Sequence, residues 1–83
     1  MTKGISHRRN EKAIMTLAKN IKRYRLEKNL TIQELANLID VDYSQIGRME
    51  RGVVNPNISI IFDIADALNL EPKKLLDVNE PLR

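Results

Sequence analysis

Apolar residues recur at steps of three and four along most of the chain, the spacing typical of amphipathic helices. Polar segments with asparagine, aspartate, glycine or proline separate these stretches and suit helix ends and turns. Together they predict five helices, at residues 11–28, 31–39, 43–51, 58–68 and 72–77. Because no alternating run of β-branched residues predicts a strand, the expected fold class is all-α.

Four of the five predicted helices begin after a residue whose side chain can cap them. The best signal is TIQE, in which the Thr31 hydroxyl can accept from the Glu34 amide while the Glu34 carboxylate returns to the Thr31 amide. The other expected caps are Asn10, Asp42 and Asn57. Pro72 suits the first turn of the fifth helix, and Asn29 and Gly52 suit the left-handed position after a helix.

The second and third predicted helices are joined by a turn too short to hold another element. Two helices connected in this way at a steep angle form a helix-turn-helix, whose second helix lies in the major groove of DNA. In the third helix, Ile46 and Met49 are the residues expected to face inward. Four other side chains have no packing duty and are expected to point outward: Tyr43, Ser44, Gln45 and Arg48.

Composition is ordinary for one small globular domain, with 83 residues, 42% of them apolar and 30% charged. We expect a flexible basic arm at residues 1–10, a domain at 11–78 and a short tail at 79–83. The lack of cysteine excludes disulfides and thiolate metal sites and fits a reducing compartment. No apolar segment approaches the roughly 20 residues that a membrane span needs, so a cytoplasmic protein is the simple interpretation.

Positive charge is concentrated at the N-terminal end. Residues 1–28 contain nine Lys or Arg and two Glu, a net charge of +7, whereas the remainder has five basic and nine acidic residues, a net charge of −4. A strongly basic end often binds a polyanion, although the same pattern is also typical of a solvated helix face. Charge alone leaves both interpretations open.

Several short motifs together resemble the Cro/lambda-repressor (XRE-like) helix-turn-helix family. They are ELA at residues 34–36, I-x-x-M-E-R-G at 46–52, NP at 55–56 and IADALNL at 64–70. The resemblance extends over residues 17–76. It implies a compact, five-helix, lambda-repressor-like domain that binds double-stranded DNA as a homodimer at palindromic operators and controls transcription. It implies no cofactor.

Carried over by position, the resemblance places Tyr43, Ser44 and Arg48 where members of this family touch base edges. Arg48 is best suited to a specific contact, because a guanidinium can donate two hydrogen bonds to O6 and N7 of guanine. Flanking or phosphate contacts are expected from Gln45, Arg51, Gln33, Asn55, Asn57, Lys19, Lys22 and Arg23. The alternative is that the four outward residues of the third helix are merely exposed polar residues.

The resemblance also pairs Arg25 with Glu50, which would tie the first helix to the end of the third and neutralise a carboxylate close to phosphates. Gly47, in the middle of the third helix, either allows close approach to DNA or is simply tolerated. The basic arm either follows a groove or is disordered. Departures from the family pattern are Ile32 in place of a glutamine, Asp40 in place of the turn glycine, and Val53 and Val54 in place of basic residues.

A twofold dimer is expected because one such module reads only about four to six base pairs, too few to select a site in a genome. The expected interface is the fifth helix and its flanks, where Leu75 instead closes the core. The interface residues are Leu70, Leu76, Val78 and Leu82.

Two functional alternatives remain open. One is a DNA-binding antitoxin with a toxin as protein partner, and the other is a helix-turn-helix scaffold that binds only protein. The scaffold predicts a reading face without basic residues, which Arg48 and Arg51 contradict. An enzyme has the least support, since the sequence shows no catalytic set or phosphate-binding glycine loop. His7 is a lone histidine, so no metal site is expected.

Overall fold

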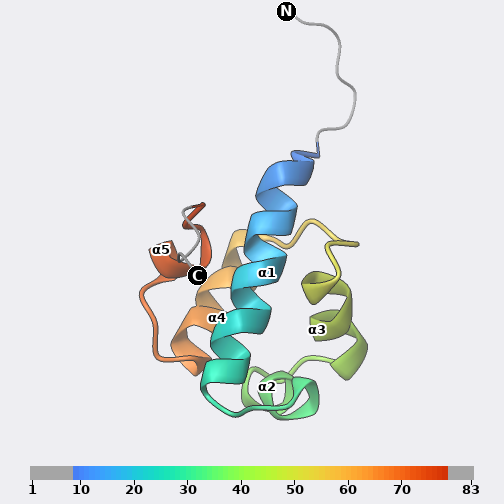
Figure 1. The fold of residues 1–83 in the computed structure, drawn as a ribbon. Coiled ribbons are helices and arrows are strands. Elements are labelled where there is room, and N and C mark those ends of the chain that lie inside the picture. Colours follow the sequence, from blue (N-terminus) through green and yellow to red (C-terminus); the bar gives the residue numbers. More distant parts are fainter. Residues whose placement is uncertain (1–8, 79–83) are drawn as a thin grey trace, which may run out of the picture.

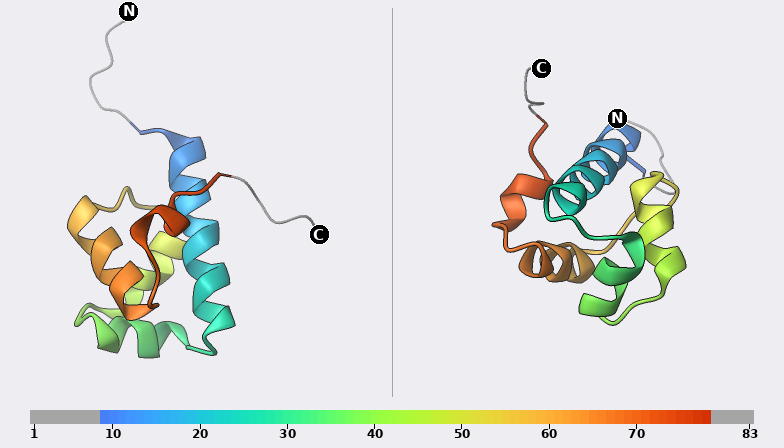
Figure 2. Two further views of the ribbon diagram at one scale, coloured as in Figure 1. Left: turned by 90° about the vertical axis from the view of Figure 1, so that its left-hand side faces the viewer. Right: turned by 60° about the horizontal axis from the view of Figure 1, so that its bottom comes forward.

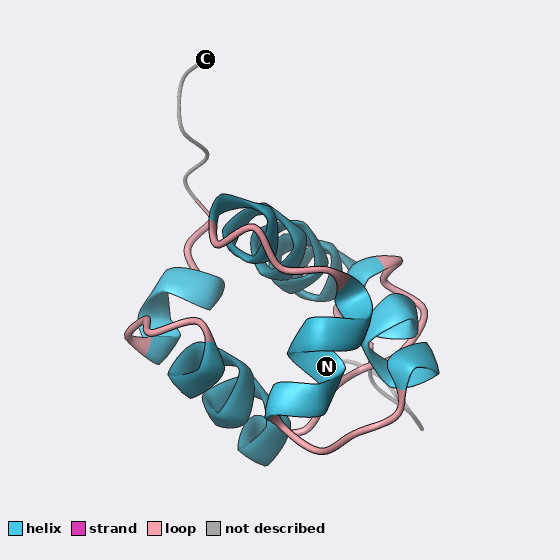
Figure 3. Ribbon diagram, turned by 90° about the horizontal axis from the view of Figure 1, so that it is seen from below, coloured by secondary structure: helices cyan, strands magenta, loops and turns pink. Residues whose placement is uncertain are grey.

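The computed structural model describes residues 9–78, and its regular elements there are all helices (Figure 1, Figure 3). They are α1 (Glu11–Glu27), α2 (Ile32–Leu38), α3 (Tyr43–Glu50), α4 (Ile58–Ala67) and α5 (Pro72–Leu75). The all-α class and the five helices are confirmed, with α5 ending two residues earlier than expected. Most of the expected arm, and the tail with Leu82, lie outside the described residues.

Helix ends follow the local signals in the sequence. Thr31 and Glu34 form the expected capping box, with N–H to oxygen hydrogen bonds of 3.0 and 2.8 Å between each backbone and the other side chain. Asn10 and Asn57 each accept from the backbone N–H three residues on, at 2.9 and 3.0 Å. Four described residues have a positive φ, each two positions after a helix: Asn29, Asp40, Gly52 and Asn69. Glycine, asparagine and aspartate tolerate this conformation best, so each of these four helices ends where the sequence permits the chain to turn.

The helices share one apolar core. Helix α1 runs through the middle of the molecule, with α3 and α5 on opposite sides of it (Figure 1), and Figure 2 shows α5 against α1 and α4. Every helix or its cap contributes a fully buried side chain, and these are Ile21, Leu35, Ile46, Ile64, Leu68 and Leu75. Burying each such side chain stabilises the fold by about 1.5–3 kcal/mol. Helices as short as α2 and α3 therefore depend on this shared core rather than on their own propensity.

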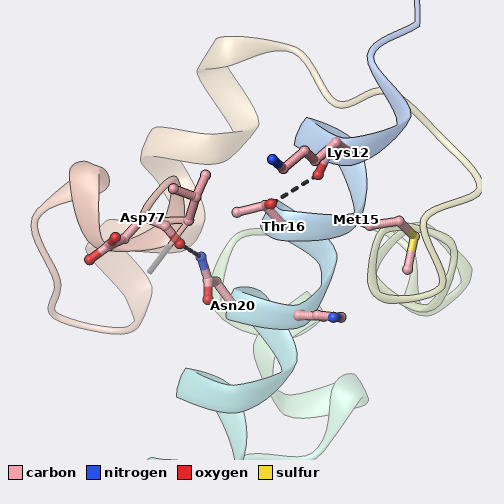
Figure 4. A pocket seen from close by; sticks show the side chains of 7 residues that line it. Lys12, Met15, Thr16, Asn20 and Asp77 are labelled. Carbon is pink, nitrogen blue, oxygen red and sulfur yellow. Dashed lines mark hydrogen bonds between the residues drawn. The ribbon is translucent and has the colours of Figure 1, made fainter. Parts of the chain in front are cut away.

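The chain after α5 is tied to α1 by a buried amide. Asn20 Nδ2 donates to the carbonyl oxygens of Leu75 at 2.8 Å and Asp77 at 3.0 Å (Figure 4). A buried amide left without partners would cost about 1–3 kcal/mol, so the segment and the helix stabilise each other. This attachment leaves Leu76 and Val78 exposed, at 49% and 61% of their surface.

Candidate nucleic-acid interface

The two sides of α3 differ in character. Ile46 and Met49 are buried in the core, whereas Tyr43, Gln45 and Arg48 are exposed, as the sequence predicts. Helix α3 packs against α2 across a four-residue connection, and it lies at the edge of the molecule (Figure 1). The two helices thus form the expected helix-turn-helix, with a polar and basic surface on its second helix.

A buried ion pair fixes the end of α3 to α1. Arg25 Nε donates to Glu50 Oε2 at 2.6 Å and Nη2 donates to Oε1 at 2.9 Å, and the two side chains are only 7% and 5% exposed. The remaining Nη1 donates to the carbonyl oxygen of Leu30 at 2.7 Å. Hydrogen bonding to Glu50 raises the pKa of Arg25 above its ordinary value. The expected pair is present, and it also holds the connection between α1 and α2.

Four of the expected DNA-contacting residues surround one hollow between α3 and the following loop. Gln45 and Arg48 come from α3, and Asn55 and Asn57 come from the loop. The hollow has a volume of about 190 Å³, and the rest of its wall is mostly apolar: Met49, Val54, Pro56 and Ile60. Polar residues separated by up to a dozen positions in sequence thus line one hollow.

Arg51 lies over a glycine on the same helix. A Cβ added to Gly47 would come within 3.1 Å of Arg51 Nη1, which is closer than ordinary contact. Gly52 is required for a different reason, since its φ is +72° and a Cβ there would collide with Met15 Sδ. In Figure 4 the Met15 side chain points toward this end of α3. The two glycines therefore leave room for an arginine and a methionine.

Arg9 also reaches the end of α3, a contact that sequence analysis did not identify. Its guanidinium donates to the carbonyl oxygens of Val53 at 3.3 Å and Gly52 at 3.4 Å, and to Glu11 Oε2 at 2.7 Å. The hydrogen bond between the two side chains raises the pKa of Arg9 and lowers that of Glu11. Because more than 40 residues separate Arg9 from these carbonyls, no local pattern could have signalled the contact.

The start of α3 differs from expectation at Asp42. This residue occupies the N-cap position, as predicted, but its side chain makes no capping hydrogen bond. The N–H of Gln45 bonds instead to the backbone carbonyl of Asp42, at 2.9 Å. Ser44, which the resemblance assigns to base contacts, is half-buried and donates its hydroxyl to Asp42 Oδ2 at 3.2 Å.

The expected phosphate contacts outside α3 have varied surroundings. Gln33 is exposed and donates Nε2 to Asn37 Oδ1 at 2.9 Å. Arg23 is engaged within α1, with its Cζ 4.4 Å from the centre of the Tyr24 ring. Lys22 is exposed. Lys19 lines a second hollow, between α1 and the segment after α5, rather than the hollow beside α3.

The residues expected at a dimer interface differ in their exposure to solvent. Leu76 and Val78 are exposed, but Leu70 packs against the core, and Leu75 is fully buried as expected. Sequence analysis did not single out two exposed apolar side chains on α4, Ile58 and Phe62. Seven of the ten residues of this helix are apolar, more than its inner face needs, so apolar side chains extend beyond that face.

The fold and the surface of α3 define a helix-turn-helix protein. A family model described as helix-turn-helix matches residues 21–75, and the chain belongs to this family, as its motifs suggested. Members of the family are in general DNA-binding regulators rather than enzymes. Across residues 9–78, no helix combines the length and apolar character needed to cross a membrane, and no cluster of three or more His, Cys, Asp or Glu could hold a metal ion.

Three relatives are restriction–modification controllers or carry the name control protein. Control protein C.SmaI of Serratia marcescens is 37% identical over 60 residues, 72% of this chain and 71% of that protein. The structure of the controller C.AhdI from Aeromonas hydrophila is 32% identical, covers 75% of this chain and 94% of its own, and has a TM-score of 0.73. The controller C.Esp1396I was solved as a tetramer with its natural 35-base-pair operator. It is 26% identical, the match covers 78% of this chain and 96% of that chain, and the TM-score is 0.68.

Proposed function

We propose that this protein is a sequence-specific regulator of transcription that binds palindromic double-stranded DNA as a homodimer, with α3 in the major groove. The observation that carries the proposal is the division of α3. Ile46 and Met49 anchor the helix, and Tyr43, Gln45 and Arg48 are left facing outward. The controllers C.SmaI and C.AhdI support it as relatives. Since DNA is the proposed ligand, the cytoplasm is the proposed location.

Base reading is assigned to the outward side of α3. In this motif the N-terminal residues of the second helix contact base edges, which suits Tyr43 and Ser44. Arg48 would read guanine through two parallel hydrogen bonds to O6 and N7. Arg48 lines the same hollow as Asn55 and Asn57, whose side-chain amides can bind the sugar–phosphate backbone.

A second copy of the chain completes the proposed reader. Two half-sites about 34 Å apart would present the two copies of α3 to successive turns of the same groove. Leu76 and Val78 remain the proposed interface, because Asn20 holds the exposed segment that carries them against α1. The assembly of C.Esp1396I on its operator shows that a relative of similar fold binds DNA as an oligomer.

The proposal is tested by selecting bound duplexes from a random library at two stated salt concentrations. We expect enrichment of a palindrome and a steep loss of affinity as salt rises, because phosphate contacts release counterions. Lack of preference among all duplexes would reject the proposal and would favour a scaffold that binds protein.

Arg48→Ala tests the assigned reader. The variant should lose preference at one position of each half-site, at a cost of about 1–3 kcal/mol at that position. Lys74→Ala is the matched control, since it removes one charge from α5, which packs on α1 and α4. Equal weakening on every sequence would instead make Arg48 a phosphate contact.

A further inference from the structure

Asp42 occupies the cap position of the reading helix without capping it. The amide that an aspartate there would normally bind, the N–H of Gln45, is taken by the backbone carbonyl of Asp42 itself at 2.9 Å. The carboxylate accepts the hydroxyl of Ser44 at 3.2 Å. An ionised carboxylate has about four acceptor positions, so this one hydrogen bond leaves most of them open.

The charge of Asp42 lies on the side of α3 that would face DNA. An exposed carboxylate at the leading end of a helix that enters a groove repels the phosphates on either side. The other acid of α3, Glu50, is neutralised by Arg25 at 2.6 Å. Among residues 9–78, no cation forms an ion pair with Asp42. Asp42 thus carries a charge that makes no hydrogen bond to the α3 backbone and keeps open acceptor positions on the side that would face DNA.

We propose that Asp42 is a base-reading residue that selects cytosine, by accepting a hydrogen bond from the exocyclic N4 amino group in the major groove. This inference rests on the proposed function and adds one residue and one base to it. Cytosine presents a donor there, whereas guanine presents the acceptors O6 and N7 and thymine presents O4. A carboxylate only accepts hydrogen bonds, so it binds the cytosine donor and repels the acceptors of guanine and thymine.

Adenine is rejected less strongly than guanine or thymine. It presents the N6 amino donor, but its N7 acceptor lies next to that donor. Besides the base contact proposed for it, Ser44 positions the carboxylate, because its hydroxyl donates to Oδ2 and leaves Oδ1 for the base. Discrimination thus combines an attractive contact with a repulsive one.

A helix-dipole role is the competing explanation. A negative charge at a helix N-terminus stabilises the helix wherever the helix lies. That role predicts that removing the charge lowers the melting temperature and leaves base preference unchanged. The cytosine contact predicts that removing the charge changes the base preference and leaves the melting temperature nearly unchanged, because the side chain makes no hydrogen bond to the α3 backbone.

The test compares base preferences of the wild type with Asp42→Asn and Asp42→Ser in the random-duplex selection. Asparagine and serine are both strong N-cap residues, so the fold should be retained, and melting curves check this. We expect the wild type to prefer cytosine at one position of each half-site. Both variants should lose that preference by roughly fivefold to a hundredfold, while their affinity for unrelated duplexes rises.

Asp40→Asn is the matched control. It removes the same charge from the same turn, at a residue with φ 59° that asparagine also tolerates. The control should raise affinity for unrelated duplexes and keep the cytosine preference. A base profile of Asp42→Asn identical to that of the wild type would overturn the inference alone. A wild type that enriches no sequence would overturn the proposed function together with it.

Discussion

The missing side chain of Gly47 leaves space on α3 that Arg51 occupies. A Cβ at this position would lie 3.1 Å from Arg51 Nη1. Sequence alone allowed two explanations for this glycine, close approach to DNA or simple tolerance. The structure adds a third explanation, in which the absent side chain lets the Arg51 guanidinium lie along the helix. This position limits the directions in which the guanidinium can point.

Replacing Gly47 with alanine separates these explanations. Alanine should raise the free energy of unfolding by up to about 1 kcal/mol through helix propensity, since the end of a flexible arginine can move aside. DNA affinity should nevertheless fall, because Arg51 is displaced from its position. Chemical denaturation and DNA titration measure the two effects.

A double-mutant cycle provides the control for Gly47. In an Arg51→Ala background the alanine at position 47 should have little further effect on DNA affinity. An equal loss of affinity in both backgrounds would mean that the added methyl group touches DNA directly. Unchanged affinity in both would mean that glycine is only tolerated.

At the scale of elements, α3 is positioned by long-range contacts rather than by its own eight residues. Arg25 links it to α1 and to the carbonyl of Leu30, and Arg9 binds the carbonyls that follow it. The buried pair leaves no negative charge from Glu50 exposed beside the reading surface. Packing and charge compensation thus act together on this helix.

Arg25→Ala should lower the free energy of unfolding by about 3–5 kcal/mol, because it leaves the buried Glu50 carboxylate without its partner. Lys28→Ala, at an exposed site one turn further along, should change it by less than about 0.5 kcal/mol. Urea denaturation of the two variants measures the difference. Equal shifts would show that the pair contributes nothing.

The contribution of Arg25 should not depend on pH in the neutral range. Its pKa is raised in the folded state, so the stabilisation is fully present below the unfolded-state pKa and is lost only as pH rises through the folded-state value. Both pKa values lie far above the neutral range. The difference between wild type and Arg25→Ala should therefore be the same at pH 7 and pH 9, and a difference that shrinks by pH 9 would argue against this assignment.

At the scale of the whole molecule, two of the places where residues 9–78 expose apolar side chains lie in the C-terminal third of the chain. One is the segment with Leu76 and Val78 after α5, and the other is the outer side of α4 with Ile58 and Phe62. Exposed apolar clusters on small proteins commonly mark association surfaces. The proposed dimer uses the first.

Leu76→Asp combined with Val78→Asp should convert a dimer to a monomer, since burying an unpaired carboxylate costs more than about 2 kcal/mol. Sedimentation measures the oligomeric state, and binding to the full palindrome should weaken while folding is retained. Leu26→Asp, at an exposed site on α1, is the control. If the double variant stays dimeric while Phe62→Asp does not, the interface lies on α4.

Sequence by itself determined the local features of this protein. The capping box at Thr31, the asparagine caps and the left-handed positions two residues after four of the five helices depend on groups only a few residues apart. The apolar period determined that five helices pack on one core, and the motifs at residues 46–52 and 64–70 indicated the family. These features can be predicted from sequence because they depend on residues close along the chain, which stay close in any fold.

Only the tertiary structure decided which side chains are free to bind. It brought Asn55 and Asn57 beside Arg48, placed Lys19 in a different hollow, and attached Arg9 to carbonyls beyond α3. Even at Asp42 the sequence could not choose, because the backbone carbonyl and the carboxylate of one residue compete for the same N–H. Such outcomes depend on the geometry and burial of groups that meet only once the chain has folded.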